Sequence, residues 1–371
     1  MSRFVTAEPI PPGEYLRDEI DARGWTHADL AEVLDMSRRQ VVNLITGTSA
    51  VTPETAIALA QAFDQDAETW MHLQVSYELA RAARKERDIE KRAAVYNKVP
   101  VREMVRRGWI DEHKDPTLLS EAVCRFLRIP SISHDPERKW AARKSGSYKV
   151  DNGAQIAWHS RAKQLAECVS VPKYSPRNFA RTVAQLRQLM ANRHDVRRVP
   201  RVLAGAGIRF VIVQHLKGSK VDGASFWLGD SPTIAVTLRY DRIDNFWFTL
   251  MHELAHVKYR DESLDVALME TDDATLPEIE RRANKDAAEY LVPQDKLESF
   301  IRRCGRLYYQ RRLVEFANWQ QVHPGIVVGQ LHWRRELKHS QFRRLLEKVK
   351  NEIVGQALTD GWGDCPATGV E

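Results

Sequence analysis

The stretch FTLMHELAHVKYR, residues 248–260, contains two histidines that bracket a glutamate. In an α-helix, residues i and i+4 lie on one face, so His252 and His256 can present their imidazoles to the same metal ion. Glu253 lies about 100° round the helix, where its carboxylate can hydrogen-bond a metal-bound water without ligating the metal. Chance would produce such a pentapeptide in roughly a few chains per hundred of this composition. The spacing therefore predicts a zinc-dependent hydrolytic centre.

Short β-prone segments precede this motif, and an acidic segment and a helix follow it. Residues 209–214, ASFWLGD and TIAVTL predict a small sheet directly before the histidine-containing helix. Residues 261–277 then carry six acidic and no basic residues. The next helix, PEIERRANKDAAEYLVP, offers several carboxylates as the third protein ligand of a zinc site that keeps a position open for water. These carboxylates are Glu278, Glu280, Asp286 and Glu289.

These segments together resemble the ImmA/IrrE family of metallopeptidases, over roughly residues 178–335. The family has an Arg-x-x-Phe-Thr approach to HExxH, here RIDNFWFTLMHELAHV, and a Glu-x-x-Ala-Asn helix ending in Leu-x-Pro, here ERRANKDAAEYLVP. The resemblance implies that Glu280 is the third zinc ligand, with Asn284 one turn later as support. Two departures affect the packing around the site: three residues separate Arg242 from Phe246, and Asp286 stands where an aromatic residue is common.

The chemistry of peptide hydrolysis assigns the remaining roles. A bound Zn2+ lowers the pKa of water and polarises a peptide carbonyl, and Glu253 would take the water's proton and deliver it to the leaving amine. An oxyanion donor is usually needed as well. His323, in WQQVHPGIVVGQLHW, is the first candidate, although a histidine beside a turn is more often structural. His332 and Tyr290 are weaker candidates.

The stretch WTHADLAEVLDMSRRQVVNLITG, residues 25–47, predicts a helix-turn-helix. Thr26 and Ser37 can cap two short helices, Asp35 and Met36 break the pattern between them, and Gly47 ends the second helix. Arg and Gln in the first turn of the second helix can make bidentate contacts to guanine and adenine in the major groove. The predicted DNA-contacting residues are Ser37, Arg38, Arg39, Gln40 and Asn43.

Residues 11–82 resemble the HigA-type antitoxin subfamily of Cro/C1-like (XRE) DNA-binding proteins. The resemblance includes the PPGE start, the VTPETAIALAQAF helix and the WMHLQ..YEL end. Asp35 stands where a glycine is usual, but aspartate tolerates a left-handed conformation, so we expect the turn to be kept. The resemblance implies a homodimer that binds a double-stranded operator with an inverted repeat.

Composition sets wider limits. The 371 residues are 43% hydrophobic and 29% charged, which suits two or three globular domains without a membrane span. The four cysteines lie far apart and predict free thiols in a reducing cytosol. The net charge of +6 permits a nucleic-acid partner without establishing one. We expect a cytoplasmic, nucleoid-associated protein.

We therefore expect a multidomain protein. An all-α helix-turn-helix domain covers residues 1–82, and a mostly helical connector covers 83–176. An α+β zincin-like metallopeptidase domain with a small sheet covers 177–354, and a flexible tail covers 355–371. Within the connector, SHDPERKWAARKSGSYKVDNG mixes basic and aromatic residues, which predicts an exposed loop and leaves single-stranded nucleic acid as an alternative.

These predictions give a main hypothesis and two alternatives. The main hypothesis is a regulator whose zinc endopeptidase cleaves a partner helix-turn-helix repressor, or regulates its own operon, in a stress, prophage or toxin–antitoxin setting. The first alternative is an antitoxin-type repressor whose metal domain is a non-catalytic sensor or structural module. The second is a peptidase whose first domain binds a protein instead of DNA. TIAVTL, residues 233–238, is the predicted edge strand for substrate, and residues 83–176 are a possible site of self-cleavage.

Overall fold

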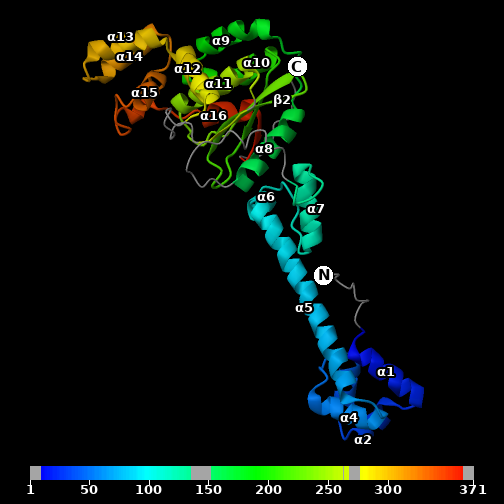
Figure 1. The fold of residues 1–371 in the computed structure, drawn as a ribbon. Helices are drawn as coiled ribbons and strands as arrows, with labels where there is room; N and C mark the ends of the chain where they lie inside the picture. The colour runs from blue at the N-terminus through cyan, green and yellow to red at the C-terminus, as the bar shows by residue number, and fades with distance from the viewer. Residues whose placement is uncertain (1–9, 135–151, 262, 267–275, 362–371) are drawn as a thin grey trace. The chain divides into compact units, whose positions relative to one another are not determined.

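The computed structural model describes residues 10–134, 152–261, 263–266 and 276–361 (Figure 1). The chain divides into two compact units, residues 1–93 and 94–371. Helix α5, Ala67–Lys98, contributes residues to both units. The predicted domain boundaries at 82/83 and 176/177 stay predictions. No helix in the described part of the chain is long and apolar enough to cross a membrane.

The first unit is a bundle of short helices that ends in α5. Its helices before α5 are α1 (Pro12–Arg23), α2 (His27–Val33), α3 (Arg38–Ile45) and α4 (Pro53–Phe63). The caps form where the sequence predicts them: Thr26 forms a capping box with Asp29, and Ser37 forms one with Gln40. Leu30, Leu59 and Trp70 are fully buried in the core of this unit.

The turn between α2 and α3 confirms the expected conformation of Asp35. Its φ is 53°, in the left-handed region that a glycine would adopt without strain. The backbone N–H of Met36 donates to the carbonyl of Ala31 across this turn, over 2.9 Å. Ala31 is buried, and its small side chain lets the two helices cross closely. The helix-turn-helix therefore forms without the usual glycine.

The second unit is built on a five-stranded mixed sheet in the order β4-β2-β3-β1-β5. The strands are β1 (Arg209–Val213), β2 (Val221–Leu228), β3 (Ser231–Val236), β4 (Ser263–Val266) and β5 (Leu358–Asp360). Strand β1 runs parallel to β3 and to β5. Strand β2 runs antiparallel to β3 and to β4.

The sheet corrects two predictions. TIAVTL lies mostly in β3, which pairs with β1 on one side and β2 on the other, so it offers no edge to a substrate. The predicted tail over 355–371 contains β5, because Leu358 and Thr359 are buried and can add to the parallel edge of β1. The carboxylate of Asp360 also accepts hydrogen bonds from Trp109 and Arg161. Residues 362–371 lie outside the described residues.

Helices cover both faces of this sheet, and alternate residues of its strands enter two different cores. Phe210, Ile212 and Ile234 face a core that includes α11, Ile243–Tyr259. Val211, Val213 and Ala235 face a second core built with helices of the expected connector. These helices are α6 (Val101–Arg106), α7 (Pro116–Leu127) and α8 (Asn152–Glu167). The period of two along β1 thus places α11 and the connector helices on opposite faces.

The remaining helices of the second unit lie on or around the core that contains α11 (Figure 1). They are α9 (Phe179–Gln188), α10 (Val199–Gly205), α12 (Glu278–Leu291), α13 (Gln294–Cys304), α14 (Gln310–Trp319), α15 (Pro324–Trp333) and α16 (Lys350–Ile353). Among the described residues of this unit, short 3-10 helices lie at Pro176–Asn178, Arg193–Arg198 and Arg343–Leu345, and Val354–Gln356 forms another before β5.

Candidate metal centre and DNA-recognition helix

Helix α11 is enclosed by the rest of the second unit. Every residue from Ile243 to Val257 is buried, and outside the motif this includes three polar side chains, those of Asp244, Asn245 and Thr249. Helix α11 packs against the sheet and against α12 and α15. Its C-cap is Arg260, which adopts a left-handed φ of 57°. The fold thus places the predicted motif inside the protein and not on a surface helix.

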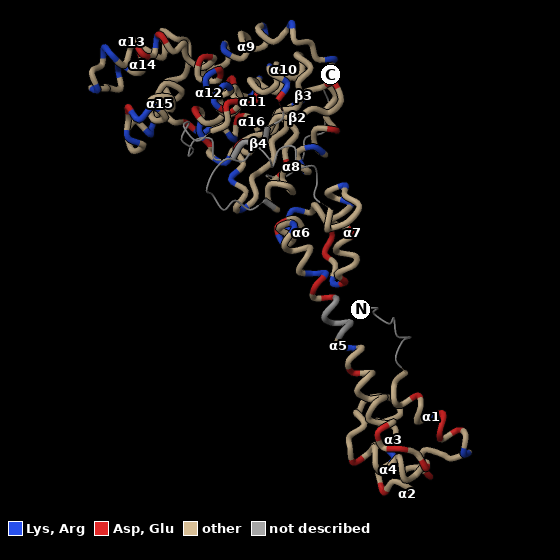
Figure 2. Tube along the Cα trace, in the orientation of Figure 1, with Lys and Arg blue, Asp and Glu red and all other residues tan. Residues whose placement is uncertain are grey.

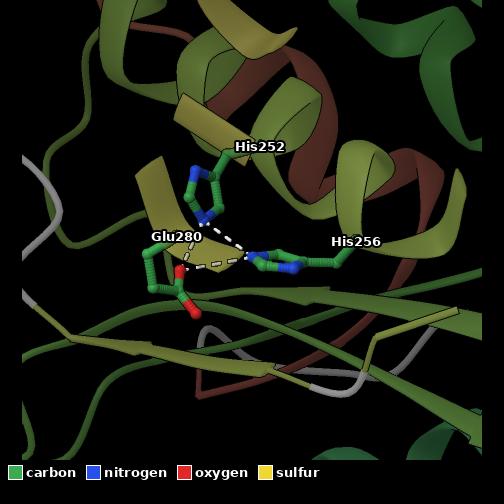
Figure 3. Close-up of side chains that lie close together, drawn as sticks. All are labelled: His252, His256 and Glu280. Atoms are coloured by element: carbon green, nitrogen blue, oxygen red, sulfur yellow. Dashed lines mark hydrogen bonds and ion pairs between the residues drawn. The ribbon is translucent and has the colours of Figure 1, made fainter. Parts of the chain in front are cut away.

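Three side chains converge where α11 meets α12 (Figure 3). The Nε2 atoms of His252 and His256 lie 3.0 Å apart. One carboxylate oxygen of Glu280 lies 3.2 Å from the Nε2 of His252 and 3.3 Å from that of His256. Among the described residues, this is the group of histidine, cysteine and acidic side chains whose atoms are arranged to hold a metal ion.

The size of this triangle fits a zinc ion. Zn–N and Zn–O bonds are about 2.0–2.2 Å long, so neighbouring ligand atoms of a tetrahedral site lie roughly 3.3–3.6 Å apart. The three separations of 3.0, 3.2 and 3.3 Å are close to that edge length. Two imidazole nitrogens and a carboxylate oxygen are also a donor set that zinc accepts in hydrolytic sites. The described residues therefore fit the predicted metal.

Glu253 is completely buried and lies against the backbone of β2. A Cβ atom added at Gly223 would come within 2.3 Å of a carboxylate oxygen of Glu253 and 2.9 Å of the methyl group of Thr249. Only a glycine leaves room for the glutamate at this point. The pairing of β2 with β4 is irregular between Val221 and Gly223, as in a β-bulge. Our sequence analysis did not find Gly223, although a glycine inside a strand is a known sign of close backbone approach.

A carboxylate also lies behind one of the histidines. An oxygen of Asp261 is 3.6 Å from the Nδ1 of His256, and Arg282 donates to the same oxygen over 2.8 Å. Burial opposes ionisation of this carboxyl, but the neighbouring imidazole of His256 and the hydrogen bond from Arg282 hold its pKa below the ordinary value. A carboxylate in this position orients a metal-binding imidazole through its other nitrogen. Helical periodicity could not indicate Asp261, because this residue lies just after the end of α11.

Helices α11 and α12 are fastened together by a polar cluster around Asp286. One carboxylate oxygen of Asp286 accepts hydrogen bonds from Lys258 at 2.7 Å, from the hydroxyl of Tyr259 at 2.9 Å and from that of Tyr290 at 3.1 Å. We call these four residues the Asp286 clamp. It explains how the chain accommodates an aspartate where the ImmA/IrrE resemblance leads one to expect an aromatic residue.

The structure places the three candidate oxyanion donors in other roles. His323 caps α15: its Nδ1 accepts from Gly325 N–H over 3.1 Å, and its Nε2 lies 3.4 Å from Glu347. Gly325 packs against Ile243 in the first turn of α11. His252 follows nine residues later, roughly 13 Å farther along the helix at 1.5 Å per residue. We therefore do not retain His323 as a catalytic residue.

The two weaker candidates also have partners of their own. The Nε2 of His332 lies 3.0 Å from the carbonyl oxygen of Gln341, and the hydroxyl of Tyr290 belongs to the Asp286 clamp. Asn284, the residue expected to support Glu280, is buried on α12 one turn after it. That role for Asn284 stays a prediction.

On the helix-turn-helix, the structure separates the predicted DNA contacts into two groups. The side-chain oxygen of Gln40 accepts from the backbone N–H and the hydroxyl of Ser37, over 2.8 and 2.7 Å. Ser37 and Gln40 are therefore engaged in capping α3. Arg38 and Arg39 are exposed in its first turn, and Asn43 is half-buried. The guanidinium groups of the two arginines are thus the side chains most available for a groove.

Comparison with known protein families gives two matches that agree with this geometry. A model described as a helix-turn-helix matches residues 16–70. A model of the M78 peptidases, described as an IrrE N-terminal-like domain, matches residues 206–317. The second match begins just before β1 and contains α11 and α12, with all three residues of the triangle.

Curated relatives match about a fifth of the chain. An uncharacterised HTH-type transcriptional regulator of Haemophilus influenzae is 34% identical over 77 residues, which are 20% of this chain and 72% of that protein. Virulence-associated protein I of Dichelobacter nodosus is 31% identical over 81 residues, which are 22% of this chain and 75% of that protein.

Solved structures similar to this chain also cover less than a quarter of it. An addiction-module antidote protein of a HigA family from Coxiella burnetii is 32% identical and covers 23% of this chain and 95% of its own, with a TM-score of 0.22. The Pseudomonas aeruginosa antitoxin HigA, solved with the higBA promoter, is 38% identical and covers 22% of this chain and 91% of its own, with a TM-score of 0.21.

Proposed function

From the premise that this chain belongs to the helix-turn-helix transcriptional regulators and carries an IrrE-like domain of the M78 peptidases, we propose that it joins operator binding to peptide-bond hydrolysis. In this proposal the first unit binds double-stranded DNA as a homodimer. The second unit is a zinc endopeptidase that cleaves a partner helix-turn-helix repressor. The observation that supports the zinc endopeptidase is the triangle of His252, His256 and Glu280.

The residues of the site divide the work as follows. His252, His256 and Glu280 would hold Zn2+, which when bound lowers the pKa of water and polarises the scissile carbonyl. Glu253, next to His252 and held against β2, takes the proton of the attacking water and returns it to the amine that leaves. Asp261 fixes the ring of His256 through its Nδ1. Water is consumed, and one carboxyl and one amino terminus are formed.

The substrate must present an extended segment to this site. Folded domains rarely expose one, so an interdomain linker or a locally opened helix of a partner is the expected target. Helix-turn-helix repressors contain such linkers. We expect cleavage of a specific partner and weak activity on casein. A cut within 83–176 of this chain itself also stays a prediction, and residues 135–151 of that segment lie outside the described residues.

The test uses the full chain and its Glu253→Gln variant, which removes the base without changing the size of the side chain. Each is incubated with helix-turn-helix repressors encoded beside it, with zinc and with a chelator, and the products are identified by mass spectrometry. Zinc-dependent cleavage by the wild type alone supports the proposal. Rapid, unselective digestion of casein would contradict it, as would intact candidates under every inducing condition tried.

One observation favours the alternative of a repressor with a non-catalytic metal domain. His252, Glu253 and His256 are each fully buried, and only Glu280 of the triangle's members is partly exposed, at 13% of its side chain. A metal held this deeply also suits a sensing or structural centre. In that case zinc would be bound and would stabilise the second unit, while Glu253→Gln would leave the regulation of the operon unchanged.

A further inference from the structure

The hairpin of α13 and α14 has an open pocket that the proposed metal centre does not use. We call it the hairpin pocket; its volume is about 600 Å³. Its lining includes the rings of Phe300, Phe316 and Trp319 and the charged side chains of Arg303, Arg312 and Glu315. Both helices are anchored in the main core of the unit through Leu297 and Leu313, so the pocket has a fixed frame.

The floor of the pocket is apolar and rigid. Phe300 and Phe316 are 5% exposed, and their rings stack with centroids 4.3 Å apart. Trp319 stands beside Phe316 and is 64% exposed. Tyr309, whose ring lies beside Arg312 of the lining, is 57% exposed. Large apolar side chains that cluster on a surface in this way mark an interaction site more often than a solvated face.

The rim of the pocket is positively charged. Residues 294–319 contain six basic and three acidic residues, a net charge of +3 (Figure 2). Glu315 is paired with Arg311 over 2.8 Å, so its charge is balanced within α14. Arg303 donates to the hydroxyl of Ser299, and Arg312 lies over the ring of Tyr309, so neither of these contacts is with a carboxylate. The positive charges of both arginines can therefore pair with acidic groups of a ligand at the edge of the pocket.

We propose that the hairpin pocket binds an acidic, amphipathic segment of a partner protein. A large apolar side chain of that segment rests on Phe300 and Phe316 beside Trp319, and flanking Asp or Glu side chains pair with Arg303 and Arg312. Trp, Tyr and Arg are the residues that most often dominate protein interfaces, especially around a recessed apolar anchor. This binding does not depend on catalysis at the metal centre.

A protein segment fits the pocket better than a nucleic acid. Its recessed floor receives a side chain, whereas a run of stacked bases needs several exposed ring faces. Phe300 and Phe316 are nearly covered, and of the three aromatic rings of the lining only that of Trp319 is exposed. Single-stranded nucleic acid is therefore an outcome for the test to separate.

The test measures binding of short fluorescent peptides to the full chain by anisotropy. The probe alternates Leu and Phe with Asp and Glu. One control peptide has Lys in place of the acidic residues, and another has Ser in place of the apolar residues. A labelled single-stranded oligonucleotide is the third control. We expect saturable binding of the acidic, apolar peptide alone, at least tenfold tighter than either control peptide and weaker as salt is raised.

Variants then locate the binding surface. Trp319→Ala and Arg312→Glu each change an exposed side chain of the lining and should lower the affinity about tenfold or more without changing thermal unfolding. Leu118→Ser and Arg177→Glu are matched controls elsewhere in the unit and should bind as the wild type does. The proposal is overturned if no acidic peptide binds saturably or if Trp319→Ala and Arg312→Glu bind it normally. It is also overturned if the oligonucleotide binds more tightly and loses affinity in the same variants.

Discussion

The two functions proposed for the HELAH motif, metal binding and proton transfer, can be tested one residue at a time. If His252, His256 and Glu280 hold the metal, the purified chain should carry about one zinc, and His252→Ala or His256→Ala should remove it because each supplies one of three ligands. Glu253→Gln should retain the metal and lose hydrolysis. Metal analysis of the dialysed proteins is the measurement, with the exposed His72→Ala as control. Full zinc in a double His252→Ala, His256→Ala variant would refute the assignment.

A different histidine should make the second unit sensitive to acid. His159 is buried against the ring of Phe226, and burial, together with the nearby charge of Lys163, lowers its pKa to about 3. The unfolded chain binds this proton with a pKa near 6.5, so the unfolded state takes up more protons between these two values. Stability from the neutral ring is therefore complete above about pH 6.5 and is lost as the pH falls towards 3.

The size of this effect follows from the linkage relation. Between pH 7.5 and pH 5, His159 alone should remove about 2 kcal/mol of unfolding free energy. His159→Phe keeps a ring beside Phe226 and should abolish this part of the pH dependence. Chemical unfolding of wild type and variant at both pH values, followed by tryptophan fluorescence, gives the difference directly. Equal pH dependence in the two proteins would show that His159 is protonated or hydrated in the folded state.

Residues of the site could be predicted only where their spacing is local. His252, Glu253 and His256 lie within five positions, so one turn of helix relates them. Glu280 lies on another helix, and the spacing alone left four carboxylates open until the family resemblance was used. Asp261 and Gly223 could not be predicted, because their roles arise from contacts between elements that the sequence does not place side by side.

At the scale of elements, the triangle of His252, His256 and Glu280 depends on the register of α12 against α11. The Asp286 clamp joins the two helices six residues after Glu280, through hydrogen bonds from Lys258 and Tyr259 near the end of α11 to one carboxylate of α12. Asp286→Ala should cost about 1–3 kcal/mol of stability, because it leaves Lys258 and the two tyrosines without their shared acceptor. It should also weaken zinc binding about tenfold, as is typical when support behind a metal site is lost.

Competition with a chromophoric chelator measures this affinity. Asp295→Ala, on the exposed first turn of α13, is the control and should change neither stability nor zinc affinity. Asp286→Asn keeps the shape but not the charge, and should lie between Asp286→Ala and wild type in both measurements. Unchanged zinc affinity in a clearly destabilised Asp286→Ala protein would show that the clamp supports the fold without positioning Glu280.

The predicted elements were most accurate where capping and periodicity agree. Thr26, Ser37 and Gly47 lie at the ends of α2 and α3 as expected, because their signals are local. The arrangement of strands in the sheet was harder to predict than the helix ends. Strand order depends on pairing between distant segments, so β3 was wrongly taken for an edge and β5 was missed at the end of the chain. A short strand such as β5 is stabilised by β1 and by contacts of Asp360, and not by its own three residues.

At the scale of the whole molecule, the two compact units predict that operator recognition and metal chemistry can be lost separately. Residues 1–93 contain the helix-turn-helix, and residues 94–371 contain the triangle of His252, His256 and Glu280. Substitutions at His252 or Glu253 should therefore leave the intrinsic affinity for DNA unchanged, whereas changes in α3 should leave zinc content unchanged. The operator itself should be an inverted repeat with half-sites about one helical turn apart if the chain binds as a dimer.

The exposed arginines of α3 provide the last prediction, because they distinguish base reading from general attraction. Gln40 is engaged with Ser37, so Arg38 and Arg39 are left to contact base edges. If the contact of one of them is bidentate, its change to Ala should cost about 1–3 kcal/mol of discrimination at one base pair in each half-site. Gln40→Ala should instead destabilise α3 by about 1 kcal/mol through loss of the capping box. Titration of the full chain against operator variants at two salt concentrations measures both effects. A uniform loss of affinity for every sequence, with a salt slope smaller by about 1, would assign the arginine to a phosphate. Binding that depends on salt but not on sequence, in wild type and variants alike, would indicate that the first unit recognises a protein partner instead of an operator.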